Sequence, residues 1–320
     1  MTRLIGLLRR ELLIALTAIS MLPACGGTAL EPQATPPAEL RLGFFPNLTH
    51  ATALVGIKKG FLQDALGAQT TLEPSVFSSG SNLVEALLSG SIDATYIGPN
   101  PTLTAYARSH GQAVRVISGA TSGGAALVVR PGVPLKTLAS PGLGSTQDVA
   151  LRWWLKQNGR ADEITVLPQD NSQTLQTFKS GQIDGAWVPE PWATRLVLEA
   201  GGRVLVDERD LWPAGQFVTT LLVVRTDFLL QHPETVKRLL AGHAQAGQWL
   251  NANPAEAQAA VTDYLTELTG SKLSPAVTAR AWSHMTFTLD PLPATLRTAA
   301  DHAIELGLLP PVDLTDLYAR

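Results

Sequence analysis

The sequence predicts an α/β fold of two lobes, each built around its own mostly parallel sheet. Short apolar segments alternate with amphipathic segments from about residue 40 to residue 207, which is typical of βαβ units. One segment occurs twice without a gap, because LLSGSIDATYIGPNP at 87–101 aligns with FKSGQIDGAWVPEPW at 178–192. A second pair, AALVVR at 125–130 and TLLVVR at 220–225, indicates two strands that cross between the lobes.

The first lobe is expected to begin with residues 40–128. Its predicted strands are 40–46, 71–79, 92–98 and 114–120, and its predicted helices are 51–62 and 81–90. Pro74 indicates an edge strand or a bend, since proline cannot donate to a sheet ladder. Ser81 or Asn82 can cap the second helix, and Gly90 can end it.

The second lobe is expected at 129–221, and residues 222–320 return to the first lobe. Predicted helices 145–159 and 171–181 alternate with predicted strands 164–169, 183–189 and 203–207. The C-terminal part is mostly helical, most clearly at 232–250 and 253–270, and these helices are expected to pack on the first lobe. In the last of them Asn253 is expected to cap, Pro254 to occupy the first turn and Gly270 to end the helix.

The N-terminus is typical of an exported protein. Arg3, Arg9 and Arg10 precede the apolar run LLIALTAISML at 12–22, which predicts a signal peptide over residues 1–24. Leu22-Pro23-Ala24-Cys25 resembles a bacterial lipobox, so Cys25 is the predicted lipidation site, and 25–39 is a Gly/Pro-rich tether. The protein is then expected in the periplasm or on the outer face of the cell membrane. The alternative is an ordinary secretory signal with an incidental cysteine.

Composition and motifs argue against several classes of function. The chain is 45% hydrophobic and 16% charged, as in globular proteins, and its net charge of −3 without a basic stripe argues against a nucleic-acid partner. One cysteine leaves no internal disulfide and no cysteine metal site. The six histidines show no HxH or HExxH spacing, and GxSxG, P-loop and GxGxxG motifs are absent. The sequence therefore predicts a protein that is not an enzyme, with no catalytic residues, cofactor or metal.

A ligand is expected beyond the carboxyl ends of the strands, where open α/β sheets bind small molecules. The turns there are 45–50, 78–82, 98–101, 121–124, 144–148 and 188–192, and they contain hydroxyls, amides and aromatics but no Lys or Arg. Two of them begin helices, whose free N–H groups attract anions. The candidate ligand-binding residues are Asn47, Thr49, His50, Ser79, Gly80, Ser81, Asn82, Gly98, Pro99, Asn100, Thr121, Ser145, Thr146, Gln147, Trp187, Glu190 and Trp192.

Glu190 lies between Pro189 and Pro191. We expect its carboxylate to face the cleft, where it would favour a ligand with an amine or N–H donors and disfavour a plain anion. The competing interpretations are structural: Glu190 caps the helix that follows, single Ser, Thr and Asn residues at helix starts are only caps, and Trp187 and Trp192 belong to the core.

Four blocks resemble a known family: the lipobox, GFFPNLTHATALVGIKKGFL, SSGSNLVEALLSGSIDATYIGPNP and SGQIDGAWVPEPWATR. Over roughly residues 40–250 the chain resembles the aliphatic sulfonate/nitrate/taurine class of ABC-importer substrate-binding proteins, a class that includes binders of thiamine-pyrimidine precursors. The resemblance implies a two-lobed type II periplasmic-binding-protein fold with two crossing hinge strands, which closes on a small ligand. It also implies delivery of that ligand to an ABC permease driven by its ATPase.

Other functions on this fold stay open at this point. The ligand could be a sulfonate, taurine, nitrate or an aminopyrimidine, and the protein could instead be an exported enzyme or a sensor domain. Enzymes that build the thiamine pyrimidine resemble the Pro46-Asn47-x-x-His50 turn but use a cysteine-rich iron motif. The chain has no cysteine beyond Cys25, which argues against that chemistry.

Overall fold

The computed structural model describes residues 37–319. The predicted signal peptide, Cys25 and most of the predicted tether lie outside these residues. The end of the tether, 37–39, is part of the folded body, because the Thr70 hydroxyl donates to the Pro37 carbonyl at 2.9 Å and the first strand begins at Glu39. None of the described helices is both long enough and apolar enough to span a membrane.

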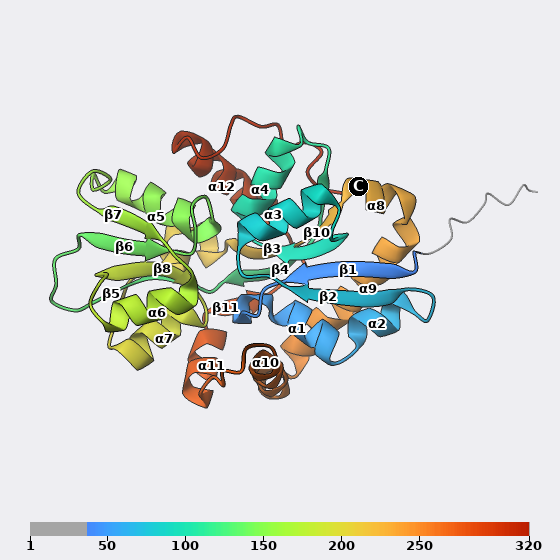
Figure 1. Cartoon of the computed structure of the whole chain (residues 1–320), viewed down its shortest axis with the longest axis horizontal. Coiled ribbons are helices and arrows are strands. Elements are labelled where there is room, and N and C mark those ends of the chain that lie inside the picture. The colour runs from blue at the N-terminus through green and yellow to red at the C-terminus, as the bar shows by residue number, and fades with distance from the viewer. Residues whose placement is uncertain (1–36, 320) are drawn as a thin grey trace, which may run out of the picture. The chain divides into compact units, whose positions relative to one another are not determined.

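The described residues form two β-sheets (Figure 1). In the first sheet β1, β2 and β3 run parallel, whereas β10, β4 and β11 are antiparallel to their neighbours. Pro74 lies in the edge strand β2, as predicted. The strands in sheet order are β11 (Met285–Phe287), β4 (Val114–Gly123), β10 (Val218–Arg225), β3 (Ala94–Ile97), β1 (Glu39–Phe44) and β2 (Thr71–Val76).

The second sheet repeats this arrangement with different residues. Strands β6, β7 and β8 are parallel, and β5 and β9 are antiparallel. Its short strand β6 was not predicted. The strands in sheet order are β7 (Thr165–Pro168), β6 (Thr137–Ser140), β8 (Gly185–Pro189), β5 (Ala125–Val129) and β9 (Arg203–Asp207).

The repeated Ser-Gly-x-Ile-Asp segments have the same structural role in both sheets. Gly90 and Gly181 end their helices with φ of 74° and 76°, in the left-handed region that favours glycine. Asp93 Oδ2 then accepts from the Arg41 N–H at 3.0 Å, while Asp184 Oδ2 accepts from the Thr137 N–H at 2.9 Å. Each aspartate therefore fixes the neighbouring strand.

The Leu-Val-Val-Arg pair belongs to the same repeated unit. The Arg225 N–H donates to the Asp93 carbonyl at 2.9 Å, and the Arg130 N–H donates to the Asp184 carbonyl at 2.8 Å. Strands β5 and β10 are thus equivalent strands, each the first after a change of sheet. The chain changes sheet at Gly123–Gly124 and again between β9 and β10, so the predicted boundaries at 128/129 and 221/222 fall inside β5 and β10.

Helices cover both sheets. The predicted helix 51–62 is split, because Gly60 has a φ of 81° that an α-helix cannot accommodate. The 3₁₀ helices are η1 (Leu48–His50), η2 (Glu208–Leu211) and η3 (Pro213–Gly215). The α-helices up to β10 are α1 (Ala51–Lys58), α2 (Phe61–Leu66), α3 (Gly80–Ser89), α4 (Pro99–Arg108), α5 (Thr146–Gln157), α6 (Asn171–Lys179) and α7 (Trp192–Ala200).

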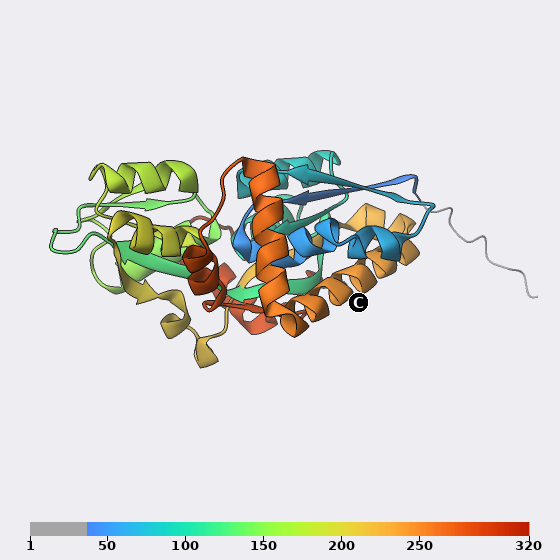
Figure 2. The same cartoon turned by 90° about the horizontal axis from the view of Figure 1, so that it is seen from below.

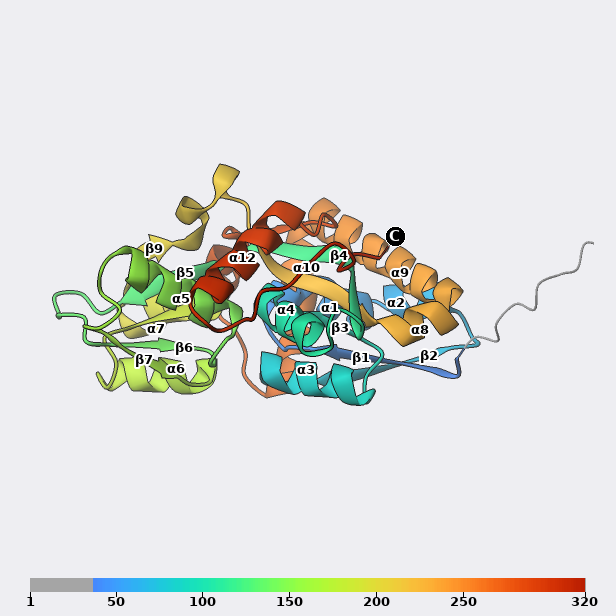
Figure 3. The same cartoon turned by 90° about the horizontal axis from the view of Figure 1, so that it is seen from above.

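The two C-terminal helices that were predicted pack on the first half, as expected, whereas two later helices contact the second half. These helices are α8 (Thr226–Gln231), α9 (Pro233–Ala252), α10 (Pro254–Thr269), α11 (Pro275–Trp282) and α12 (Pro293–Glu305). Helices α9 and α10 contact α1 of the first half (Figure 2). Helix α11 contacts α7, and α12 contacts both α4 and α5 (Figure 3). Asn253 does not cap α10, because its amide donates back to the Trp249 carbonyl at 3.0 Å.

Candidate functional site

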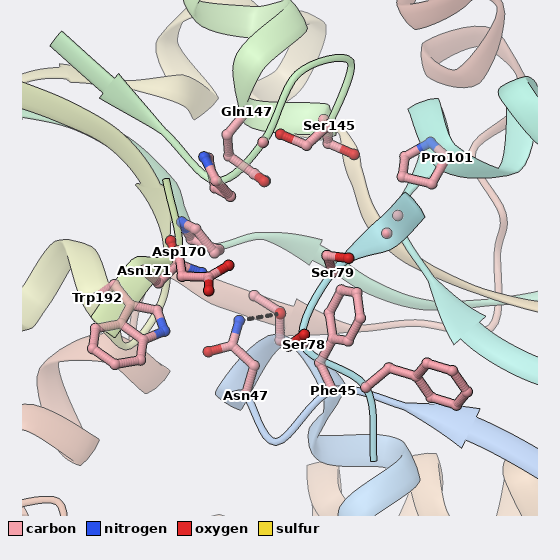
Figure 4. Close-up of a pocket in the computed structure, with 18 of the residues that line it drawn as sticks. Phe45, Asn47, Ser78, Ser79, Pro101, Ser145, Gln147, Asp170, Asn171 and Trp192 are labelled. Atoms are coloured by element: carbon pink, nitrogen blue, oxygen red, sulfur yellow. Dashed lines mark hydrogen bonds between the residues drawn. The ribbon is translucent and has the colours of Figure 1, made fainter. Parts of the chain in front are cut away.

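A cavity of about 1040 Å³ lies between the two sheets, where the predicted turns converge. Its walls come from turns of both halves, as expected for ligand sites at the carboxyl ends of strands (Figure 4). The predicted residues that line it are Asn47, Thr49, His50, Ser79, Gly80, Ser81, Gly98, Ser145, Thr146, Gln147 and Trp192.

The start of α3 presents unused N–H groups to this cavity. Ser79 is the cap, in place of the predicted Ser81 or Asn82: its hydroxyl accepts from the Asn82 N–H at 3.3 Å and its carbonyl accepts from the Leu83 N–H at 3.3 Å. The first N–H groups of a helix have no acceptor within the helix. Gly80 and Ser81 therefore keep free N–H groups, with no acceptor among the described residues.

The start of α5 repeats this geometry from the other half. The Ser145 hydroxyl accepts from the Asp148 N–H at 3.3 Å, and the Ser145 carbonyl accepts from the Val149 N–H at 3.0 Å. The N–H groups of Thr146 and Gln147 are left without an acceptor among the residues described. A β-carbon on Gly98 would lie 2.6 Å from Thr146 Oγ1, so the two halves meet closely at this point.

Two arginines that the turns did not predict, Arg108 and Arg195, also line the cavity. Arg108 Nη1 lies 2.5 Å from Glu85 Oε1, and Arg195 Nη2 lies 3.1 Å from Glu199 Oε2. The Arg195 guanidinium also lies over the Trp192 ring, 4.8 Å from its centroid. Both cations have carboxylate partners, whereas the N–H groups of the two helix starts have no acceptor among the described residues.

His50 is a neutral member of the wall. Its side chain is buried, its Nδ1 accepts from the Phe45 N–H at 3.3 Å, and burial lowers its pKa to about 3. Neighbouring Asn47 donates through Nδ2 to Thr49 Oγ1 at 3.0 Å, while its buried Oδ1 has no donor among the residues that the structure describes. This first-half turn therefore adds hydrogen-bonding groups to the cavity but no charge.

Sequence reasoning missed the segment at the start of α6. Asp170 and Asn171 line the cavity and follow strand β7 after Gln169. The rule that selected the other turns, a strand end followed by a helix start, applies equally to 169–172. Other lining residues that were not predicted include Phe45, Phe77, Ser78, Pro101, Ser172 and Gln176.

Six candidate residues do not line the cavity: Glu190, which is described below, and five others. Asn82 and Pro99 belong to the first turns of their helices, and Asn100 is buried with Nδ2 donating to the Ala299 carbonyl at 3.3 Å. Thr121 is buried and donates to the Thr49 carbonyl at 2.7 Å. Trp187 is fully buried in the core, where its Nε1 donates to Glu208 Oε2 at 2.6 Å.

The carboxylate of Glu190 does not face this cavity, contrary to the expectation from its sequence context. It is 1% exposed and accepts from the Thr194 N–H at 3.0 Å, from the Thr194 hydroxyl at 2.9 Å and from His284 Nδ1 at 2.7 Å. Glu190 thus caps the first turn of α7 and joins it to the segment after α11. A second, smaller cavity of about 180 Å³ lies beside it.

No group of three or more metal-ligating side chains exists in the part of the chain that the structure describes. The arrangement can hold an anion against the helix starts and enclose its organic part between the halves. Neither a nucleophile–base pair nor a metal is needed for such binding.

Known proteins match this chain in sequence and in structure. The sequence profile of the NMT1-like family matches residues 33–264. The taurine-binding periplasmic protein of Escherichia coli K12 is 29% identical over 194 residues, which are 58% of this chain and 59% of that protein. The bicarbonate-binding protein CmpA of a Synechococcus species is 25% identical over 250 residues, 68% of this chain and 55% of that protein. The matched segments thus span less than two thirds of either relative.

The structural comparison concerns the fold. The alkanesulfonate-binding protein SsuA from Xanthomonas axonopodis pv. citri, bound to MOPS, superposes with a TM-score of 0.75 at 23% identity, covering 90% of this chain and all of that one. This likeness confirms the predicted periplasmic-binding-protein fold.

Proposed function

The chain belongs to the NMT1-like family, and from this premise we propose that it is the extracytoplasmic solute-binding component of an ABC importer. It captures a small organic anion, with a sulfonate as the leading candidate, between its two halves. It then presents that ligand to a membrane permease driven by an ATPase. The relatives support this class, since they are named for binding taurine, bicarbonate and alkanesulfonate.

One observation carries the ligand proposal. Four N–H groups without acceptors, those of Gly80 and Ser81 on one half and of Thr146 and Gln147 on the other, belong to residues that line the same cavity. Helix N-termini stabilise anions through these groups and through the helix dipole. A sulfonate has three oxygens that share one negative charge, so it can accept from both helix starts at once. The cavity of about 1040 Å³ leaves room for an organic group as well.

Thr146 offers a direct test of this geometry. Ser145 is already extended (φ −68°, ψ 164°), as a residue before proline should be, and Thr146 is the first helical residue, where proline is tolerated. Thr146→Pro therefore removes one N–H donor with little strain, whereas Thr146→Ala removes only the hydroxyl. By titration calorimetry, Thr146→Pro should weaken sulfonate binding by about ten- to a hundredfold, the value of one charged hydrogen bond. Thr146→Ala should weaken it less.

The ligand panel should include alkanesulfonates, an aminoalkanesulfonate, nitrate, bicarbonate and an aminopyrimidine. Binding without turnover supports an importer component over an enzyme on the same fold. If the folded protein binds no sulfonate, or if both Thr146 variants bind as tightly as the parent, the anion site at the helix starts is wrong.

We also propose that Cys25 carries a lipid that anchors the protein to the cell surface. The proposal rests on the lipobox-like Leu22-Pro23-Ala24-Cys25 and on the export that binding to a permease from outside requires. It places the protein in the periplasm or on the outer face of the cell membrane.

A further inference from the structure

We propose that Asp148, a buried carboxylate behind the start of α5, is a positioning residue for anion binding. It holds the turn that carries the N–H groups of Thr146 and Gln147. Arg152 neutralises its charge, so that an anion can bind on the other side of that turn. This inference rests on the proposed function above and extends it to residues that do not contact the ligand, since neither Asp148 nor Arg152 lines the cavity.

The Asp148 carboxylate is fully buried and joins three parts of the second half. Its Oδ1 accepts from the Ser140 hydroxyl at 2.6 Å, and its Oδ2 accepts from the Gly144 N–H at 2.9 Å. Arg152 Nε donates to both oxygens, at 3.0 Å and 2.9 Å. Ser140 ends strand β6 and is itself fully buried. The carboxylate therefore ties the end of a strand and the turn after it to the second turn of α5.

The same residue closes the cap of α5. Ser145 caps the helix by accepting from the Asp148 N–H, while the Asp148 carboxylate accepts from Gly144, the residue before the cap. Reciprocal bonds of this kind, between a cap and the third helical residue, hold the first turn of a helix in one conformation. Without the carboxylate only the Ser145 hydroxyl would hold the turn, and the free N–H groups would lose their fixed direction.

Gln147 gives an independent indication that this turn binds a ligand. It lines the cavity and is only 7% exposed, yet its amide has no hydrogen-bond partner among the described residues. A ligand can reach this amide, because neither of its polar atoms is fully buried. Buried side-chain amides are usually hydrogen-bonded in folded proteins. Figure 4 shows Gln147 and Ser145 across the cavity from Ser78.

Capping alone does not account for the buried carboxylate. Helix α3 starts with the same serine cap, but it has no acidic residue in its first turn, and Asn82 occupies the position that corresponds to Asp148. The two helix starts thus differ in how they are held. The start of α5 is fixed to strand β6 through the Ser140 hydroxyl, and the carboxylate is what makes this connection.

The charge of Asp148 opposes anion binding, and Arg152 offsets it. Gly144, which donates to the carboxylate at 2.9 Å, itself lines the cavity, so the negative charge lies directly behind the wall. Two negative charges repel each other strongly where water is excluded. Arg152 forms an ion pair with Asp148 at 2.9 Å, and no other ion pair of Asp148 occurs among the residues that the structure describes. Removing Arg152 would leave that charge without a counter-ion.

Titration calorimetry with propane-1-sulfonate tests the positioning role through two variants of Asp148. Asp148→Ala and Asp148→Asn both remove the negative charge, so the difference between them measures positioning alone. Asparagine keeps an oxygen for the Gly144 N–H and a polar group for the Ser140 hydroxyl, whereas alanine keeps neither. Asp148→Asn should therefore bind the sulfonate about tenfold more tightly than Asp148→Ala, the value of one well-placed hydrogen bond to a charged group.

A second pair of variants tests the charge. Arg152→Met leaves the carboxylate without its counter-ion and should weaken sulfonate binding by about tenfold or more. Adding Asp148→Asn to Arg152→Met removes the unpaired charge and should restore most of that affinity. If the ion pair served only the stability of the fold, these variants would differ in melting temperature and the folded proteins would bind alike. Arg160→Met is the matched control, because Arg160 pairs with Glu163 in the same half and does not line the cavity.

The outcomes separate this inference from the proposed function. If Asp148→Ala and Asp148→Asn bind the sulfonate equally tightly, or if Arg152→Met binds it as tightly as the parent protein, the inference is refuted and the sulfonate-binding function stands. Should Asp148→Ala not fold, the Arg152 variants decide, and a double variant that binds no more tightly than Arg152→Met refutes the inference. If the folded parent protein binds no sulfonate, the proposed function fails and the positioning role fails with it.

Discussion

Glu190→Gln should reduce stability and leave ligand affinity nearly unchanged. The substitution keeps the size of the side chain but replaces one carboxylate oxygen by an NH₂ group. In the structure the carboxylate accepts three hydrogen bonds, two from Thr194 and one from His284 at 2.7 Å. A glutamine oxygen can accept one or two of these hydrogen bonds. The NH₂ group cannot accept a hydrogen bond, so the donor that faces it would lose its acceptor.

The magnitude follows from burial. A hydrogen bond to a charged group contributes about 1.5–3 kcal/mol, and a buried donor left without an acceptor costs about 1–3 kcal/mol. Glu190 is 1% exposed, but the His284 side chain is 24% exposed and is partly screened by water, so we expect a loss of about 2–4 kcal/mol. At roughly 2–3 °C per kcal/mol for a domain of this size, the melting temperature should fall by about 5–10 °C. Glu190 does not line the larger cavity, so the Kd of the ligand should change by less than about threefold.

The assay pairs thermal unfolding by circular dichroism with titration of whichever ligand the wild-type protein binds. Glu163→Gln is the control, because its side chain is 66% exposed and forms only a surface pair with Arg160, which is worth less than about 1 kcal/mol. A tenfold loss of affinity in Glu190→Gln at an unchanged melting temperature would show that the carboxylate acts on the ligand after all, and the assignment of Glu190 as a structural cap would have to be abandoned.

Three other perturbations have defined outcomes. Burial raises the pKa of Glu208 from 4.5 to about 7, so its contribution to stability is complete below about pH 4.5 and is lost as the pH rises toward 7. Between pH 5 and pH 8 the melting temperature of Glu208→Gln should therefore rise relative to that of the wild type. A difference between the two melting temperatures that does not change with pH would contradict this. Gly123→Ala should cost about 1–3 kcal/mol more in urea unfolding than Gly132→Ala. Both glycines have φ near +75°, but only at Gly123 would a β-carbon lie 2.6 Å from the His284 carbonyl. Equal losses would exclude that contact as a constraint. Cys25→Ser should release the protein from membrane fractions, whereas retention in the membrane pellet would argue against a lipid anchor.

Much of the fold could be predicted because its signals are local. The two Ser-Gly-x-Ile-Asp segments each contain a helix-ending glycine and a strand-fixing aspartate, so the repeat itself revealed two equivalent units. Likewise, the hydroxyl-rich turns at 78–82 and 144–148 were recognisable as helix starts, and both line the cavity.

Contacts between distant segments could not be predicted in this way. In a strand with one exposed face, polar and apolar residues alternate and so indicate which side chains belong to the core. Strand β8 is buried along its whole length, so its sequence lacks this alternation and does not indicate where the side chain of Trp187 lies. The partner that buries the Glu190 carboxylate is His284, which follows a helix that was not predicted and that packs against α7. Nothing in the local sequence around 178–192 indicates that partner.

Glu190 and Asp170 show what decides the role of a carboxylate in this fold. Both follow a strand of the second sheet and precede a helix, so their local sequence contexts are equivalent. The order of the strands makes the difference: β8 lies between β6 and β5 in the interior of the sheet, whereas β7 is at its edge. The carboxylate after the central strand is covered by the C-terminal segment and satisfied by His284 and Thr194. The carboxylate after the edge strand has no such cover, and it lines the cavity with its hydrogen-bonding capacity unused. Strand order is set by pairing between segments far apart in the chain, so the sequence alone directed attention to the carboxylate between two prolines and away from the one that faces the ligand cavity.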